Sequence, residues 1–152
     1  MNYNNTDIVA KLKTEYQGIA TLTAGGTGDD TAITGASVLA QAYNTGKLVV
    51  TYTATLAEGK TLDLDVLLLH SDDNSTWTTV TVETAKVVST GDGITGGSTN
   101  TGVYEYDFNR EKIGRYIKST VTPNLNATGT DTARVATLFV LGGAYENPVT
   151  VG

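Results

Sequence analysis

The sequence predicts an all-β protein, a single β-sandwich or jelly-roll-like domain of about eight strands. Threonine is unusually common, with 28 copies among 152 residues, while charged residues make up only 17% of the chain. A β-branched polar side chain suits the solvated face of a pleated strand better than it suits a helix. The 17 glycines provide turns, and a chain of this length forms one ordinary domain.

The N-terminal segment, residues 1–18, is expected to be a short helix or an extended arm ahead of a sandwich domain at 19–152. Asp7 can cap such a helix. Three residues fall on one face of it: Ile8, Leu12 and Tyr16. The segment ends at Gly18 and is barely long enough to hold itself helical, so the sequence leaves both alternatives open.

Alternation of apolar and polar residues predicts the strands that follow. Weak β signals at 32–39 precede the clearest strand, 47–56, whose one face is apolar and whose other face is largely threonine. Strand 62–70 starts in the same way and becomes apolar on both sides at 66–69, which indicates cover from both directions. Further strands are expected at 77–82, 84–89, 102–108, 114–122 and 134–141. The last of these is again apolar on both sides at 138–141.

Composition excludes several classes of function. With 0 cysteines and 1 histidine, the chain cannot build disulfides, thiol nucleophiles or sites with several histidines. No stretch approaches about 18 uninterrupted apolar residues, so no membrane contact is expected. The first residues lack the basic and apolar parts of a secretory signal. A net charge of -6 argues against a nucleic-acid partner, because phosphate binding needs a surplus of Lys and Arg.

One short segment contains the three residue types of a catalytic triad. His70 is followed by Ser71, Asp72 and Asp73, and a Ser-His-Asp triad uses these residue types. Neighbours at a strand end rarely point at one another, and no Gly-X-Ser-X-Gly turn is present. Turn chemistry explains the group better, so we assign no catalytic residue.

Acidic residues suggest two further sites. Asp63 and Asp65 share a strand face and could bind a cation or flank a glycosidic bond, but solvated alternation explains them more simply. Asp72–Asn74 and Asp92 lie in oxygen-rich loops of the type that calcium uses, without the ligand spacing of an EF-hand. We therefore assign no metal ligand and no cofactor-binding residue.

The basic residues cluster in one place, where the chain enters strand 114–122. The cluster consists of Arg110, Lys112, Arg115 and Lys118. We expect a solvated corner in which Tyr116 supplies a buried ring. The alternative is a charged contact for an acidic protein partner, since complementary charges set register and encounter rate.

Two stretches resemble a known family. Residues 67–80 (LLLHSDDNSTWTTV) resemble the hairpin of strand, Ser-Asp-Asp, Trp and strand in small β-sandwich structural proteins of tailed bacteriophages. Residues 114–118 (GRYIK), together with 138–144 (LFVLGGA) and Pro148, resemble the Arg-Tyr strand and Leu-Gly-Gly ending of the same proteins. This resemblance implies a non-enzymatic capsid decoration (cement) protein, or an allied virion protein, that binds and stabilises an assembled phage head.

On this reading the partner is the major capsid protein of a phage head. The chain would be made in the bacterial host cytoplasm and would lie on the capsid exterior. The two runs that are apolar on both sides predict a homo-oligomer, such as a trimer at a threefold site, unless residues 19–41 cover them in a monomer. Residues 1–18 are expected to dock to the capsid or to a neighbouring copy.

A second resemblance supplies an alternative function. The Ser-Asp-Asp-Asn-Ser-Thr-Trp hairpin also resembles one in discoidin-like carbohydrate-binding sandwiches, so a glycan-binding module, including one carried on a virion or tail, is the second hypothesis. Sugar sites usually offer aromatic platforms, whereas the aromatic residues of this chain lie mostly on strand faces. A glycosidase-like enzyme ranks third.

Overall fold

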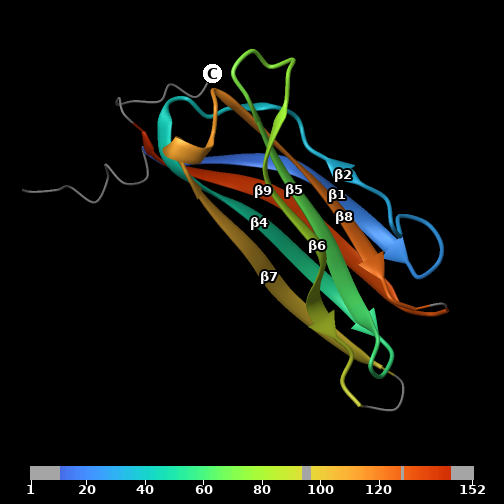
Figure 1. Cartoon of the computed structure of the whole chain (residues 1–152). Helices are drawn as coiled ribbons and strands as arrows, with labels where there is room; N and C mark the ends of the chain where they lie inside the picture. Colours follow the sequence, from blue (N-terminus) through green and yellow to red (C-terminus); the bar gives the residue numbers. More distant parts are fainter. Residues whose placement is uncertain (1–10, 94–96, 128, 145–152) are drawn as a thin grey trace, which may run out of the picture.

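The computed structural model describes residues 11–93, 97–127 and 129–144. There the chain forms nine strands, packed as two facing antiparallel sheets (Figure 1), which confirms the predicted all-β sandwich. The elements are β1 (Lys13–Thr23), β2 (Ile33–Thr34), β3 (Val38–Leu39), β4 (Tyr43–Leu56), β5 (Thr61–Ser71), β6 (Thr78–Thr90), β7 (Ser98–Asn109), the 3-10 helix η1 (Arg110–Lys112), β8 (Tyr116–Leu125) and β9 (Thr132–Ala144).

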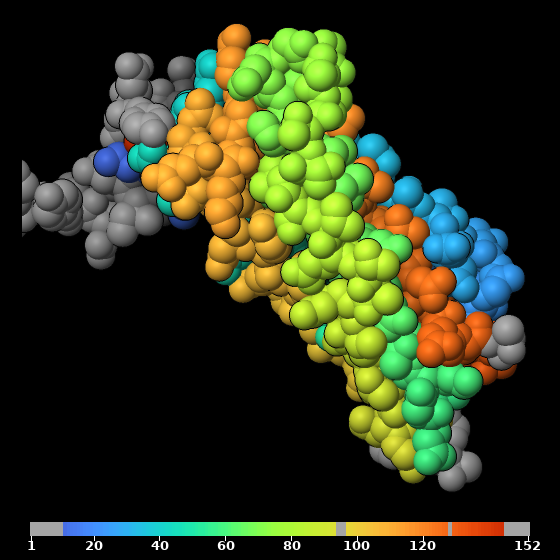
Figure 2. All heavy atoms as spheres, in the orientation of Figure 1, coloured from blue at the N-terminus to red at the C-terminus, as the bar shows by residue number. Residues whose placement is uncertain are grey.

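Each sheet combines strands that are far apart in the sequence. The four-stranded sheet has the order β1, β9, β4 and β7, and the other sheet has the order β2, β8, β5 and β6, with β3 also paired to β8. Figure 2 looks onto the five-stranded sheet of an elongated body, with β6 running along the visible face. Within the described residues, no helix is long and apolar enough to cross a membrane.

The core fills the space between the sheets. On β4, buried Leu48 and Val50 alternate with half-exposed Val49 and Thr51, and the other long strands show the same period of two. The largest fully buried side chains are Phe139, Leu22, Leu48, Leu56, Leu62, Leu64, Leu68, Ile117 and Leu141. Because one face of each sheet supplies the core, the opposite faces are free for other roles.

The two runs with apolar residues on both sides are covered on one side only. In β5, buried Val66 and Leu68 alternate with half-exposed Leu67 and Leu69, and β9 shows the same alternation. In the described part of the chain, residues 19–41 cover neither run: they add β1 to one sheet edge and pair β2 and β3 with β8. Cover of the two runs by this segment is therefore a wrong expectation, because a sandwich needs apolar residues only on the inner side of each sheet. Cover of their outer sides by a second copy stays a prediction.

β6 replaces the two strands expected at 77–82 and 84–89. Its ladder with β5 shifts register where Ala85 adopts a positive φ of 49°. Asp65 stabilises this bulge, since its Oδ1 accepts the Ala85 N–H at 2.7 Å. A β-bulge absorbs an extra residue without ending the strand, so the polar residues at 83–84 do not mark a turn.

β1 crosses the domain boundary expected after Gly18. Residues 1–10, on which the arm or helix mainly depends, lie outside the described residues. From Lys13 on, however, the chain pairs with β9, so the helical alternative is wrong for 13–18. A short isolated helix is marginal, whereas this ladder satisfies the backbone along its whole length. Gln17 lies in a bulge of β1, only 5% exposed, and its Oε1 accepts the N–H and the hydroxyl of Ser119 on β8, each at 3.3 Å.

Candidate functional site

The residues that resemble a triad are engaged in local hydrogen bonds. The N–H of Gly114 donates to His70 Nδ1 at 3.0 Å, and the N–H of Arg115 donates to Asp72 Oδ1 at 3.2 Å. The Ser71 hydroxyl donates to Asp73 at 2.9 Å. These bonds fasten the turn after β5 to the segment that leads into β8. In the described residues, the structure does not bring His70, a serine hydroxyl and a carboxylate into one hydrogen-bonded chain.

Asp73 organises the turn between β5 and β6. Its Oδ1 accepts the backbone N–H groups of Ser75 and Thr76 at 2.9 and 2.7 Å. These bonds, with the Thr76 N–H first among them, hold the pKa of Asp73 well below its usual value. Asn74 takes a left-handed conformation with a φ of 60°. For this loop the sequence leaves two explanations, a calcium site or turn chemistry. The hydrogen bonds of Asp73 show a turn.

The other acidic candidates do not gather into a metal site in the described residues, although Asp63 and Asp65 share the outer face of β5 as expected. Asp65 is committed to the β6 bulge, and Asp63 has one buried carboxylate oxygen without a hydrogen-bond partner in the described residues. The N–H of Asp92 donates to Ser98 Oγ at 3.0 Å. Across the described ranges, no group of three or more His, Cys, Asp or Glu side chains is placed to hold a metal ion.

The side chains of the basic cluster form no ion pair with the described residues and contact uncharged groups around them. Arg110 donates to the Gly114 carbonyl at 2.8 Å, and Lys118 Nζ lies 4.1 Å from the centroid of the Trp77 ring. Arg115 lies over the Tyr116 ring. Tyr116 is half-exposed, which corrects the expectation of a buried ring. It faces outward because the adjacent residue, Ile117, takes the inward position in β8.

One surface open to a partner is the outer face of the four-stranded sheet, called here the open face. Its residues are the outward members of β1, β9, β4 and β7, and the register places them in rows across the sheet. From one end, four successive rows are Thr23, Thr132, Thr55 and Thr99; Thr21, Arg134, Thr53 and Thr101; Ile19, Ala136, Thr51 and Val103; and Tyr16, Leu138, Val49 and Glu105.

The open face divides into a hydroxyl-rich end and an apolar band. The two rows at the first end carry seven threonines and Arg134. The next two rows hold the apolar band, in which Ile19 is 46% exposed, Val103 57% and Tyr16 63%. These values are high for large apolar side chains, and several of them on one sheet face form a patch of the kind that marks an interaction site.

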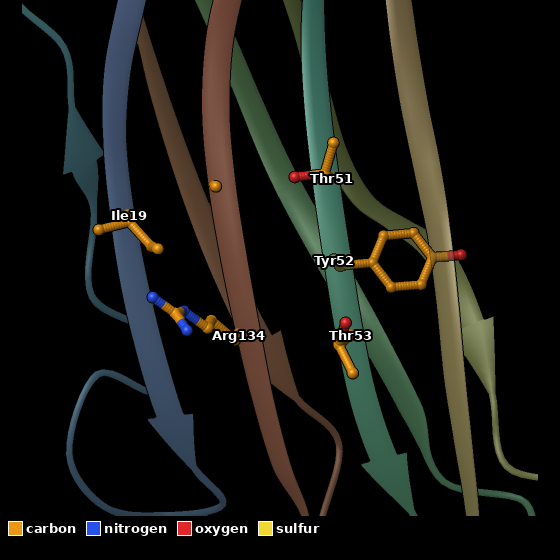
Figure 3. Close-up of a pocket in the computed structure, with 6 residues that line it drawn as sticks. Ile19, Thr51, Tyr52, Thr53 and Arg134 are labelled. Carbon is orange, nitrogen blue, oxygen red and sulfur yellow. The ribbon is translucent and has the colours of Figure 1, made fainter.

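Arg134 lies in a shallow hollow of the open face. Figure 3 shows its guanidinium extending from β9 toward β1, near Ile19, with Thr51 and Thr53 on β4. A second hollow adjoins it, lined by Thr21, Thr53, Thr55, Thr132, Ala133 and Arg134. The guanidinium makes no hydrogen bond or ion pair with the described residues. It can therefore receive a carboxylate or another planar anion in bidentate fashion.

At the other end of the open face, a lysine pairs with two acidic side chains of the neighbouring strand. Lys47 Nζ lies 2.8 Å from Glu105 and 3.4 Å from Asp107. The hydrogen bond to Glu105 is the main cause of a raised pKa for Lys47. Exposed pairs of this kind add little stability. They do leave Arg134 as the cation of this face that the described residues do not neutralise.

Sequence reasoning found the threonine side of strand 47–56 but not the open face. Ile19, Arg134 and Val103 belong to three strands, and none of them stands out within its own segment. They become neighbours only through strand pairing. β9, which comes late in the sequence, lies between β1 and β4 in the sheet. The sequence pattern that could indicate this face is a polar strand face interrupted by large apolar residues.

Comparison with known proteins identifies a shared fold. No family model matches the chain, and no curated protein matches it. A chain in the structure of the infectious bursal disease virus Gx strain is 15% identical, with a TM-score of 0.50 over 91% of this chain and 33% of that one. The PBSX exported protein XepA (18% identical, TM-score 0.38, 92% and 40% covered) and a CBM4 structure (10%, 0.43, 90% and 82%) are also similar. The present chain thus spans about a third of the viral chain, and identities this low show the fold alone.

Proposed function

We propose that this chain is a non-enzymatic structural protein of a virus particle, which binds the outer surface of an assembled phage capsid through its open face and stabilises it there. The observation that carries the proposal is the open face itself, a broad sheet surface with an apolar band beside an arginine that the described residues leave unpaired. The sandwich fold is one that it shares with a chain in a virus structure. Its partner would be the major capsid protein.

The composition of the open face fits a protein partner. The central part of a protein interface is apolar with few charges, and Arg and Tyr are enriched among the residues that contribute most to binding. Tyr16, Ile19 and Arg134 provide these residue types on adjacent strands. Threonine hydroxyls beside them supply hydrogen bonds at the edge of the contact.

The open face is also stiff. Most of its side chains are threonine or valine, which have one strongly preferred rotamer or few alternatives. Its backbone is held on both sides along β4 and β9. Little side-chain entropy is therefore lost when a partner covers it, and preorganisation of this kind favours binding.

Charge argues for a place outside the particle. A net charge of -6 disfavours contact with packaged nucleic acid, which supports a position on the capsid exterior. Synthesis in the bacterial host cytoplasm is part of the same proposal. The absence of catalysis is part of the proposal, which is supported by the local roles of His70, Asp72 and Asp73 in the turn after β5. Binding to the assembled shell alone would stabilise that shell by mass action.

The test is co-sedimentation with empty heads of the phage that encodes the chain. Ile19→Asp and Arg134→Glu change two exposed positions of the open face and should reduce binding at least tenfold, about the loss of one good contact. Val87→Asp is the matched control, since Val87 is 51% exposed on the other sheet. Equal loss for all three variants, or none for the first two, would contradict the proposal.

A carbohydrate-binding module is the second candidate, and the hollow at Arg134 favours it because threonine hydroxyls and a guanidinium can recognise an acidic sugar. Against it, the neighbouring ring of Tyr52 offers no stacking platform, since its hydroxyl donates to the Val88 carbonyl on β6. Retention on a glycan array that Arg134→Glu abolishes, without co-sedimentation, would favour this candidate.

A further inference from the structure

β7 has an unprotected edge. It is the last strand of the four-stranded sheet and pairs only with β4, in unbroken register from Ser98 to Asn109. The strand has 12 residues, with neither proline nor lysine. Along its free side, the described residues supply no hydrogen bond to its backbone. A long regular edge of this kind is a template for another strand.

The other sheet edges are blocked in familiar ways. β1 has a bulge next to Gly18, β2 has 2 residues, and β6 has three register shifts and carries Lys86. Bulges, short strands and lysines are devices that prevent pairing between edges. Since β7 has none of them, its edge is the one prepared for contact.

We infer that this edge binds a second copy of the chain, with β7 antiparallel to β7 of the partner about a twofold axis at Val103. Each residue then lies opposite the one at equal distance from Val103, so Thr101 faces Glu105 and Thr99 faces Asp107. No like charges meet in this register, and two β-branched valines meet at its centre, a favourable cross-strand pair. A shift of the axis to Glu105 would oppose two carboxylates directly.

In the plane of the sheet, none of the described residues pairs with the outer side of β7. β6 lies on the inner side of β7, where Asn100 donates to the Thr90 carbonyl at 3.0 Å and the Tyr52 ring meets Gly102. β6 and β7 form no ladder. Figure 1 shows β7 at the margin of its sheet, with no strand beyond it.

The dimer would join two four-stranded sheets into one continuous sheet. Their open faces would lie side by side, with one Arg134 in each copy. Two linked faces bind a repeating surface more tightly than either alone, provided that the spacing of the surface allows both to engage. The dimer uses a strand edge and not the outer leucines on which self-association was first expected. It does not depend on the proposed function.

Sedimentation equilibrium of variants at Val103 tests the dimer. The wild type should dimerise, and Val103→Lys should weaken dimerisation about tenfold or more, because it replaces a valine pair by facing like charges. An equimolar mixture of Val103→Lys and Val103→Glu should restore association. Val82→Lys is the control, since Val82 is similarly exposed (60%) on β6. A monomeric wild type at millimolar concentration, or an undiminished Val103→Lys dimer, overturns the inference.

A disulfide tests the register separately. The chain has 0 cysteines, so a disulfide between protein thiols in Val103→Cys must join two copies. Directly opposed residues in antiparallel strands have Cα atoms about 4.5–5.5 Å apart, which a disulfide can span. We expect Val103→Cys to form covalent dimers in a glutathione redox buffer, whereas Val82→Cys should remain mostly monomeric. Equal crosslinking of the two variants would rule out the pairing at Val103.

Discussion

Gln17 offers a sharp test of how the two sheets are joined. Its Oε1 accepts the N–H and hydroxyl of Ser119, and its Nε2 donates to the Ala36 carbonyl at 3.2 Å, all close to the buried bulge of β1. Gln17→Ala leaves the Ser119 N–H and the Ala36 carbonyl without partners. Each unsatisfied group costs about 1–3 kcal/mol, and because the contacts are long we expect about 2–4 kcal/mol in total.

Urea unfolding followed by the fluorescence of Trp77, the one tryptophan, measures this loss. Glu15→Ala is the control on the same strand. Its pair with Lys13 is partly exposed, so the expected change is below about 1 kcal/mol. Ser119→Ala, alone and combined with Gln17→Ala, should show coupling between the two residues. A loss below about 1 kcal/mol for Gln17→Ala, with an unchanged denaturant slope, would refute the reasoning.

Three further predictions follow from local contacts. Asp65→Ala should destabilise the fold by about 1 kcal/mol in urea unfolding, because the Ala85 N–H loses its acceptor; an unchanged midpoint would contradict this role. Because the pKa of Asp73 is lowered in the fold, its stabilisation is present above its unfolded pKa of about 4 and fades as the pH falls below it. Asp73→Asn should therefore flatten the acid side of a plot of urea midpoint against pH, and an equally steep curve would exclude this contribution. Gly46→Ala should lower Tm by several degrees, since a Cβ there would overlap the Phe108 ring; an unchanged Tm would show that the ring moves aside freely.

Much of the sandwich is predictable because strand alternation is a local property. The strand expected at 47–56 lies within β4, and that at 62–70 lies within β5. The sequence predicts two strands in place of β6, because the bulge at Ala85 depends on Asp65, 20 residues away. The spacing of Leu12 and Tyr16 also fits a helix, whereas the strand conformation of Tyr16 depends on pairing with β9.

The candidate site was less predictable for the same reason. Arg134 and Ile19 become neighbours only through the β1–β9 ladder, which joins the two ends of the described chain. The basic cluster, by contrast, is contiguous in sequence and was visible at once. Its contacts to Trp77 and Gln41, however, come from distant segments. Local patterns therefore give strands and turns, whereas surfaces assembled across strands require the topology.

The β1–β9 ladder also fixes where the described chain enters and leaves the body, because Lys13 stands opposite Leu141. A domain with adjacent entry and exit points can be spliced into a surface loop of another protein without stretching that loop. The same geometry makes the fold a candidate for circular permutation, with new ends in the turn at 57–60 on the far side of the sandwich.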